Sequence, residues 1–165
     1  MTYTFKKVIS ASIVLEWDNA QELLDHDSAC FIERLTTILE KNIKNNVIGS
    51  SELFIVYDPQ KIALTTLKGL LDPLLASAQT YLSVVYLAAP GTSYYEKKAV
   101  PAFLTKADIM VMADSDCVYH ENWLEQIVEP FADPSVAVVY GETFAKRGSF
   151  FRKCKCDLLV FSYRK

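Results

Sequence analysis

Apolar runs alternate with amphipathic segments along most of the chain. Six short runs of apolar and β-prone residues predict strands, over residues 8–15, 52–57, 80–87, 108–113, 135–140 and 158–163. Four segments with apolar positions at helical spacing predict helices, over residues 31–44, 62–75, 94–106 and 120–131. The third follows a predicted turn at Ala89-Pro90-Gly91, can be capped by Ser93, and is expected to be interrupted or offset near Pro101. The buried stripe of the fourth consists of Trp123, Leu124, Ile127, Val128 and Phe131. Strands that alternate with helices favour an α/β sandwich, with a mostly parallel central sheet flanked by helices.

The composition fits a single globular domain. The chain has 165 residues, of which 51% are hydrophobic and 22% charged, enough for one sizeable core. No apolar run approaches the ~20 residues that a membrane span needs, and the first residues lack the pattern of a secretory signal. The four cysteines follow no zinc or disulfide spacing, which predicts reduced thiols and a cytoplasmic location. His26 and His120 lie far apart in sequence, and we interpret both as surface or capping residues.

The most informative stretch is residues 107–118, where an apolar strand ends abruptly in Asp114-Ser115-Asp116. Two ionised carboxylates this close cannot both be buried without compensation, which favours a place at the carboxyl end of the strand. Ligands bind at that edge in open α/β sheets, and two carboxylates there form a hard-oxygen site for Mg²⁺ or Mn²⁺. The simpler interpretation is that Asp114 and Asp116 cap the next helix or form a turn.

Two other predicted strands also end in carboxylates. Glu16 and Asp18 follow the first strand, and Asp58 follows the second. Because the carboxyl ends of parallel strands meet at one edge of a sheet, we expect these residues to face the same crevice as Asp114 and Asp116. Acids from three strands indicate a site for a cation-bridged or hydroxyl-rich ligand. The chain contains neither the glycine-rich dinucleotide motif nor the P-loop motif.

Charge is distributed unevenly along the chain. Residues 1–142 carry 10 Lys or Arg and 19 Asp or Glu, whereas residues 143–165 carry 7 Lys or Arg and one Asp. A basic tail on an acidic body indicates an anionic partner for the tail, namely a diphosphate, an acidic acceptor or a membrane surface; a solvated terminus is the alternative. Peripheral membrane contact would use Phe150, Phe151, Arg152, Lys153 and Lys155. The acidic body argues against nucleic acid as a partner.

Several segments together carry a resemblance to a known family. They are residues 12–19, the strand that ends at Asp58, and residues 94–98, 107–117, 121–125 and 133–141. Over residues 8–145 the chain resembles a family 2 glycosyltransferase of the GT-A type, with residues 107–117 as the most specific part. The resemblance implies a GT-A-like, Rossmann-like sandwich. Residues 1–145 would form the nucleotide-sugar-binding domain, and residues 146–165 a basic aromatic tail that starts an incomplete acceptor region.

The resemblance also implies ligands and residue roles. The donor would be a nucleotide-diphospho-sugar, linked to UDP or GDP, bound with a divalent cation, Mn²⁺ or Mg²⁺. Asp116 would contact the metal that bridges the diphosphate, and Asp114 would lie near the ribose or share the metal. Asp58 would hydrogen-bond the base, Glu16 would lie at the nucleotide pocket, and Lys98 falls near the place where the family often has a basic residue or Asn for the nucleotide. The implied reaction is metal-assisted transfer of the sugar to an unknown acceptor hydroxyl, with inversion.

An inverting transferase also needs a carboxylate base to deprotonate the acceptor hydroxyl, and the sequence offers no candidate. After Glu142 the only acid is Asp157, and no segment resembles the acceptor-side motifs of the family. The sequence therefore resembles the donor-binding half of a transferase. Three interpretations stay open: a truncated product, a subdomain that works with a partner chain, or a non-catalytic module that binds nucleotide-sugar.

A different enzyme class also fits part of the pattern. Haloacid-dehalogenase-like phosphatases begin with an apolar strand followed by Asp-x-Asp-x-Val, which residues 109–118 match, with Asp114 as nucleophile and Asp116 as acid/base. That motif normally opens its domain, and a later acidic pair completes the Mg²⁺ site. Only 47 residues follow Val118 here, with two acids among the last 30 residues, so this alternative ranks below the transferase.

Overall fold

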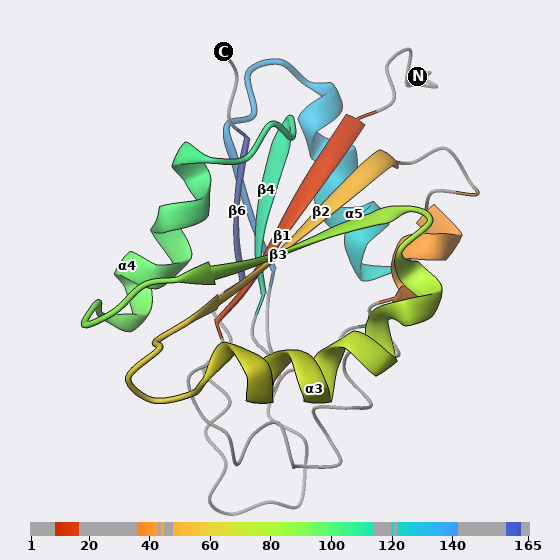
Figure 1. Ribbon diagram of the computed structural model, residues 1–165. Helices are drawn as coiled ribbons and strands as arrows, with labels where there is room; N and C mark the ends of the chain where they lie inside the picture. The colour runs from red at the N-terminus through yellow and green to blue at the C-terminus, as the bar shows by residue number, and fades with distance from the viewer. Residues whose placement is uncertain are drawn as a thin grey trace, which may run out of the picture.

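Figure 1 shows the computed structural model, which describes residues 9–16, 36–42, 44, 48–113, 120, 122–141 and 158–162. In these residues six strands form one sheet in the order β3-β2-β1-β4-β6-β5. Their bounds are β1 Ile9–Glu16, β2 Ile48–Tyr57, β3 Leu82–Ala88, β4 Ile109–Ala113, β5 Val138–Gly141 and β6 Leu158–Ser162. All six strands predicted from the sequence are present, which confirms the α/β prediction at the level of elements.

Four neighbouring strands of the sheet run parallel. β1 pairs with β2 on one side and β4 on the other, and β2 pairs with β3, all in parallel register. Only β6 runs the opposite way, between β4 and β5. The sheet is therefore mostly parallel, as predicted, and the carboxyl ends of β1, β2, β3 and β4 share one edge, which we call the carboxyl edge.

The helices cover both faces of the sheet. Residues 36–42 and 44 are helical. The other helical elements are α3 Leu64–Leu75, η1 Ala76–Ala78, α4 Tyr94–Ala99, η2 Val100–Phe103, α5 Trp123–Val128 and η3 Glu129–Ala132. In Figure 1, α4 lies on one side of the sheet, and α3 and α5 lie on the other. This three-layer arrangement is the predicted sandwich.

Two predicted helices change type at a proline. The interruption expected near Pro101 is confirmed, and the segment 120–131 changes in the same way at Pro130. The segment 94–106 is α-helical only to Ala99 and continues as the 3-10 turn η2, which contains Pro101. The segment 120–131 starts its α-helix at Trp123 and changes to η3 at Glu129, next to Pro130. Proline removes an amide donor and disfavours α-helical geometry in the residue before it, so each helix changes type there.

The strand predicted over 52–57 starts earlier, at Ile48. Residues 49–51 contain Gly and Ser, which suggested a break in the chain. In the structure these residues continue β2, and the register with β1 shifts between Ile9 and Ala11. An irregularity of this kind takes up an extra residue without ending the strand.

Alternate residues of the strands form two apolar clusters, one on each face. On the face covered by α3 and α5, Ile13, Ile55 and Val111 pack with the buried side of both helices. The predicted stripe of α5 and η3 is confirmed, since all its members are buried: Trp123, Leu124, Ile127, Val128 and Phe131. On the opposite face, Val14, Phe54, Val56, Ala89 and Met110 form a smaller cluster that Ala102 of η2 joins.

No helix within the described ranges is both long and apolar enough to cross a lipid bilayer.

The helix that matters most for the predicted site is α4, because it packs against β1 and β2. β1 ends in Glu16, and β2 ends directly before Asp58.

Candidate functional site

The carboxyl edge brings together strand ends that lie far apart in the sequence. Leu15 of β1 lies opposite both Ile55 of β2 and Ala113 of β4, so the three strands end at nearly the same level. Glu16 is the last residue of β1 and is in register with Val56. Only the backbone of Glu16 is described, and Asp114 and Asp116, which follow β4, lie outside the described residues.

Asp58, directly after β2, is buried, with 4% of its surface exposed. Its Oδ1 accepts a hydrogen bond of 2.9 Å from the amide of Gln60, and its Oδ2 accepts a longer one of 3.4 Å from the amide of Gly91. Its carbonyl oxygen accepts from the amides of Lys61 and Ile62. The carboxylate therefore joins the turn after β2 to the loop after β3, and the proline at position 59 keeps this residue out of a helix.

The loop between β3 and α4 is shaped by Gly91, whose φ of 66° is accessible to glycine at no steric cost. The predicted turn over Ala89-Pro90-Gly91 is confirmed. The amide of Ala89 donates to the carbonyl of Tyr57, and the Thr92 hydroxyl donates to the carbonyl of Ala89. These contacts fasten the start of α4 to the carboxyl edge, beside Asp58.

A capping box then fixes the first turn of α4. Ser93 Oγ accepts from the amide of Glu96 at 3.3 Å, and the amide of Ser93 donates to Glu96 Oε2 at 2.7 Å. The backbone hydrogen bond from Ser93 lowers the pKa of Glu96, and the side-chain bond of Ser93 acts in the same direction. The prediction that Ser93 caps this helix is confirmed.

α4 carries two lysines that are almost fully buried. Lys97 exposes 1% of its surface and Lys98 exposes 4%. Lysine is rarely buried to this degree, because removing an ammonium from water is costly unless anions or polar groups surround it. The Lys98 Nζ lies 4.5 Å from the centroid of the Tyr94 ring, one helical turn earlier. Two lysine side chains are therefore held beneath the surface, in a helix that follows the loop bonded to Asp58.

Comparison with known proteins extends this picture. Residues 102–162 match the family model described as glycosyl transferase family 2. The mannosyltransferase PcManGT from Pyrobaculum calidifontis, solved in complex with GDP-Man and Mn²⁺, aligns with 84% of this chain at a TM-score of 0.55 and 13% sequence identity. Residues 102–162, a little over a third of the chain, are therefore similar to family 2 glycosyltransferases, and the fold is of the GT-A type. Because the match to PcManGT is far below 25% identity, it shows the GT-A fold alone.

The aligned region is a minor part of both solved chains. The chain spans 37% of PcManGT. It spans 39% of the S. aureus TarS 1-349 chain, which covers 84% of this chain at 14% identity and a TM-score of 0.46. No curated protein sequence matches the chain significantly. The family model covers β4, α5, β5 and β6, and so includes the segment that contains Asp114 and Asp116.

Within this GT-A sheet, the structure places the predicted site residues to different extents. Asp58 and Lys98 lie in two elements that meet at the loop after β3, and the end of β1 at Glu16 is adjacent to β2. Among the described residues no group of three or more His, Cys, Asp or Glu side chains could hold a metal ion. The expected metal ligands, Asp114 and Asp116, belong to the part of the chain that is not described.

Neither Tyr94 nor Lys97 is among the site residues predicted from the sequence. The signal for Tyr94 was present, because an aromatic residue four positions before a lysine lies on the same side of a helix. Nothing in the sequence indicates that Lys97 is buried, since a lysine next to a glutamate in a short polar helix is normally exposed.

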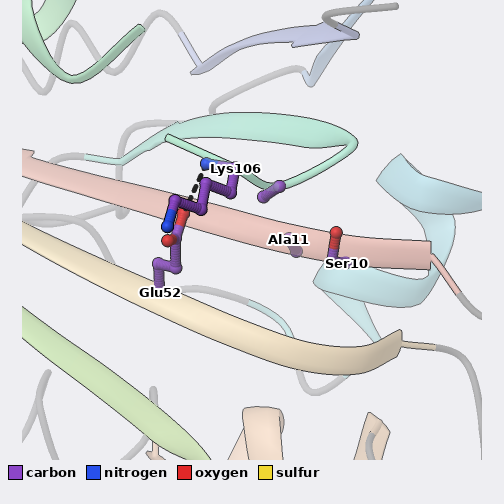
Figure 2. A pocket seen from close by; sticks show the side chains of 5 residues that line it. Ser10, Ala11, Glu52 and Lys106 are labelled. Carbon is purple, nitrogen blue, oxygen red and sulfur yellow. Dashed lines mark hydrogen bonds between the residues drawn. The ribbon is translucent and has the colours of Figure 1, made fainter. Parts of the chain in front are cut away.

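A second polar cluster lies at the opposite edge of the sheet, where the parallel strands begin. A small cavity of about 90 Å³ is lined by Ser10, Ala11, Glu52, Lys106 and Ala107. Figure 2 shows Glu52 beside Lys106, whose amide donates to Glu52 Oε2 at 3.3 Å. The Thr105 hydroxyl donates to the same oxygen at 2.6 Å. These bonds join β2 to the segment before β4, so we assign this cluster to structure and keep the candidate site at the carboxyl edge.

Proposed function

We propose that this chain binds a nucleotide-diphospho-sugar at the carboxyl edge of its sheet and acts in glycosyl transfer. The observation that supports the proposal best is the junction of Asp58, the Gly91 loop and α4, which brings a buried carboxylate and buried lysines to the edge where the Asp114–Asp116 segment begins. A nucleotide-sugar requires both kinds of group, a hydrogen-bond acceptor for its base and cations for its diphosphate.

The proposed roles follow the chemistry of each side chain. Asp58 would accept a hydrogen bond from the base, and its bonds to Gln60 and Gly91 would hold it in place. A carboxylate can accept about four hydrogen bonds, so it can support the loop and contact a ligand together. Lys98 would contact the nucleotide as a cation, and Glu16 would border the nucleotide pocket.

Asp114 and Asp116 would hold the divalent cation, Mn²⁺ or Mg²⁺. Their carboxylate oxygens are the hard ligands that both ions prefer, and β4, whose last residue Ala113 directly precedes Asp114, ends at the carboxyl edge. The PcManGT structure, which contains GDP-Man and Mn²⁺, supports the same combination of ligands here. Bound in this position, the cation would neutralise the charge that develops on the diphosphate leaving group.

The acceptor side of the reaction has no assigned residue. Inversion would require a carboxylate base, and after Glu142 the only acid in the sequence is Asp157. A second candidate function is a module that binds nucleotide-sugar and transfers the sugar only with a partner chain, or not at all. The match of residues 102–162 to a glycosyltransferase model favours both candidates over a phosphatase that uses Asp114 as its nucleophile.

Calorimetric titration tests the donor site. We expect wild-type protein to bind UDP or GDP in the presence of Mn²⁺, and to bind at least tenfold more weakly with EDTA or after Asp116→Ala. Glu125→Ala, on the exposed side of α5, is the matched control and should leave the affinity unchanged. Failure of the wild type to bind any nucleotide, or equal affinity in Asp116→Ala, would contradict the proposal. Sugar transfer by the isolated chain would exclude the non-catalytic module.

A further inference from the structure

The Lys98 side chain is held in an unusual environment for a lysine. Only 4% of the residue is exposed, and its Nζ lies 4.5 Å from the centroid of the Tyr94 ring. An ammonium above an aromatic face is attracted by the negative face of the ring, and this attraction grows when water is excluded. Tyr94 therefore provides part of the environment that lets Lys98 be buried as a cation.

The direction of the side chain follows from the same contact. Tyr94 is the first residue of α4 and Lys98 is the fifth, so the Lys98 ammonium extends toward the start of the helix. The start of α4 follows the loop in which the Gly91 amide contacts Asp58 Oδ2. The contact with Tyr94 therefore directs the Lys98 ammonium group toward the carboxyl edge and not toward the C-terminal end of α4.

Tyr94 is itself fixed in two ways. The capping box of Ser93 and Glu96 sets the first turn of α4, in which Tyr94 lies. Its ring also meets the Tyr95 ring edge to face, with centroids 5.3 Å apart and an interplanar angle of 81°. This geometry is a favoured one for aromatic pairs. Tyr94 itself is more exposed than the lysine, with 41% of its surface accessible to solvent.

We infer that Tyr94 is a positioning residue for Lys98, whose ammonium it holds on the carboxyl-edge side of α4, where a nucleotide phosphate would bind. The inference rests on the proposed function, because it assigns a role within the same donor site. Because the group that Tyr94 positions is a cation, replacing Tyr94 should weaken the binding of a ligand's phosphates and leave the binding of its nucleoside part unchanged.

The experiment compares a nucleoside diphosphate with the corresponding nucleoside, UDP with uridine or GDP with guanosine, according to which diphosphate the wild type binds. We expect Tyr94→Leu to raise the Kd of the diphosphate about threefold, the scale of a partly exposed cation–π contact, and to leave the Kd of the nucleoside unchanged. Tyr94→Phe keeps the aromatic face and should restore wild-type affinity. Lys98→Met should weaken diphosphate binding at least as much, and adding Tyr94→Leu to it should have no further effect.

The chain offers matched controls. Tyr95→Phe removes the hydroxyl of the neighbouring, mostly exposed tyrosine but keeps the ring that meets Tyr94 edge to face. Lys68→Met removes the other described lysine that lies over a tyrosine ring, 5.3 Å from the centroid of Tyr86 on the opposite side of the sheet. Neither substitution should change the diphosphate Kd. A proton NMR spectrum gives a readout independent of binding, because the ε-methylene of Lys98 should be shifted upfield in the wild type and Tyr94→Phe, and not in Tyr94→Leu.

The outcomes separate this inference from the function on which it rests. If the wild type binds the diphosphate and Tyr94→Leu binds it equally well, the role of Tyr94 is refuted while the donor site stands. Equal weakening of diphosphate and nucleoside would mean that Tyr94 only supports the fold of α4, which also refutes the role. If the wild type binds no nucleotide under any condition, both the donor site and the role of Tyr94 fail.

Discussion

At the scale of single residues, Tyr86 shows how one hydroxyl joins two elements. It lies on β3, and its OH donates to Asp72 Oδ1 of α3 at 2.6 Å. Burial raises the pKa of Tyr86 above its ordinary value of about 10, and the hydrogen bond and charge of Asp72 raise it further. The folded protein therefore keeps the phenol proton at a pH where the unfolded chain has lost it.

The sign of the resulting pH dependence follows from proton linkage. A tyrosine with a raised pKa contributes its full stabilisation below pH ~10 and loses it as the pH rises further, because the unfolded state is then favoured by ionisation. We expect Tyr86→Phe to lower the free energy of unfolding by about 1 kcal/mol at pH 8, the low end for a bond to a charged group, since the pair is partly exposed. Urea unfolding should show a smaller difference at pH 11. Tyr95→Phe is the control for loss of an exposed hydroxyl, and a constant difference at both pH values would contradict the linkage.

At the scale of elements, α4 depends on its cap because it is only six residues long. A helix this short has little stability of its own, so the Ser93–Glu96 capping box and packing on β1 and β2 must hold it. We expect Ser93→Ala to cost about 1 kcal/mol and to speed hydrogen exchange of the α4 amides, while Ser93→Asp keeps the cap. The lowered pKa of Glu96 predicts that the cap is strongest above the ordinary pKa of a glutamate and weakens as the pH falls through the lowered value. Unchanged exchange in Ser93→Ala would show that packing alone holds α4.

The sequence predicted the existence of these elements better than their ends. The apolar run before Asp114 was sufficient to locate β4, because a buried strand between two neighbours needs apolar residues on both faces. The interruption of the segment 94–106 could be predicted from Pro101, whereas the early start of β2 depends on the register shift near Ile9, a tertiary detail that periodicity does not record. Helix boundaries are set by caps and prolines over one or two residues, so a pattern of period 3.6 cannot fix them.

The features of the candidate site could likewise be predicted only in part. The position of Asp58 at the carboxyl edge could be predicted, because it requires only that parallel strands end together. Its bond to the Gly91 amide could not, since Asp58 and Gly91 are 33 positions apart and meet only when the sheet forms. The burial of Lys97 and Lys98 was equally hidden, because it depends on how α4 packs against β1 and β2 and not on the residues within the helix.

At the scale of the whole molecule, β6 connects the end of the chain to the centre of the sheet. It lies between β4 and β5, and Val160 is opposite Val111 on one side and Val139 on the other. The division into a domain at residues 1–145 and a basic tail at 146–165 predicts that residues 158–162 can be altered without harm to the domain. The topology predicts the opposite, because among the described strands β5 pairs with β6 alone.

The substitution Val160→Pro distinguishes between these two expectations. In a strand with a partner on each side, proline removes a backbone donor and its ring does not fit the ladder, so we expect Val160→Pro to lower the free energy of unfolding by about 3 kcal/mol or more. Val160→Ala keeps the amide and separates this backbone effect from the loss of side-chain volume. Denaturant unfolding of the two variants gives the comparison. If Val160→Pro is as stable as Val160→Ala, residues 158–162 are a dispensable tail, and the sheet that carries the carboxyl edge is complete without them. A large loss specific to proline would instead make the basic segment part of the fold that positions the donor site.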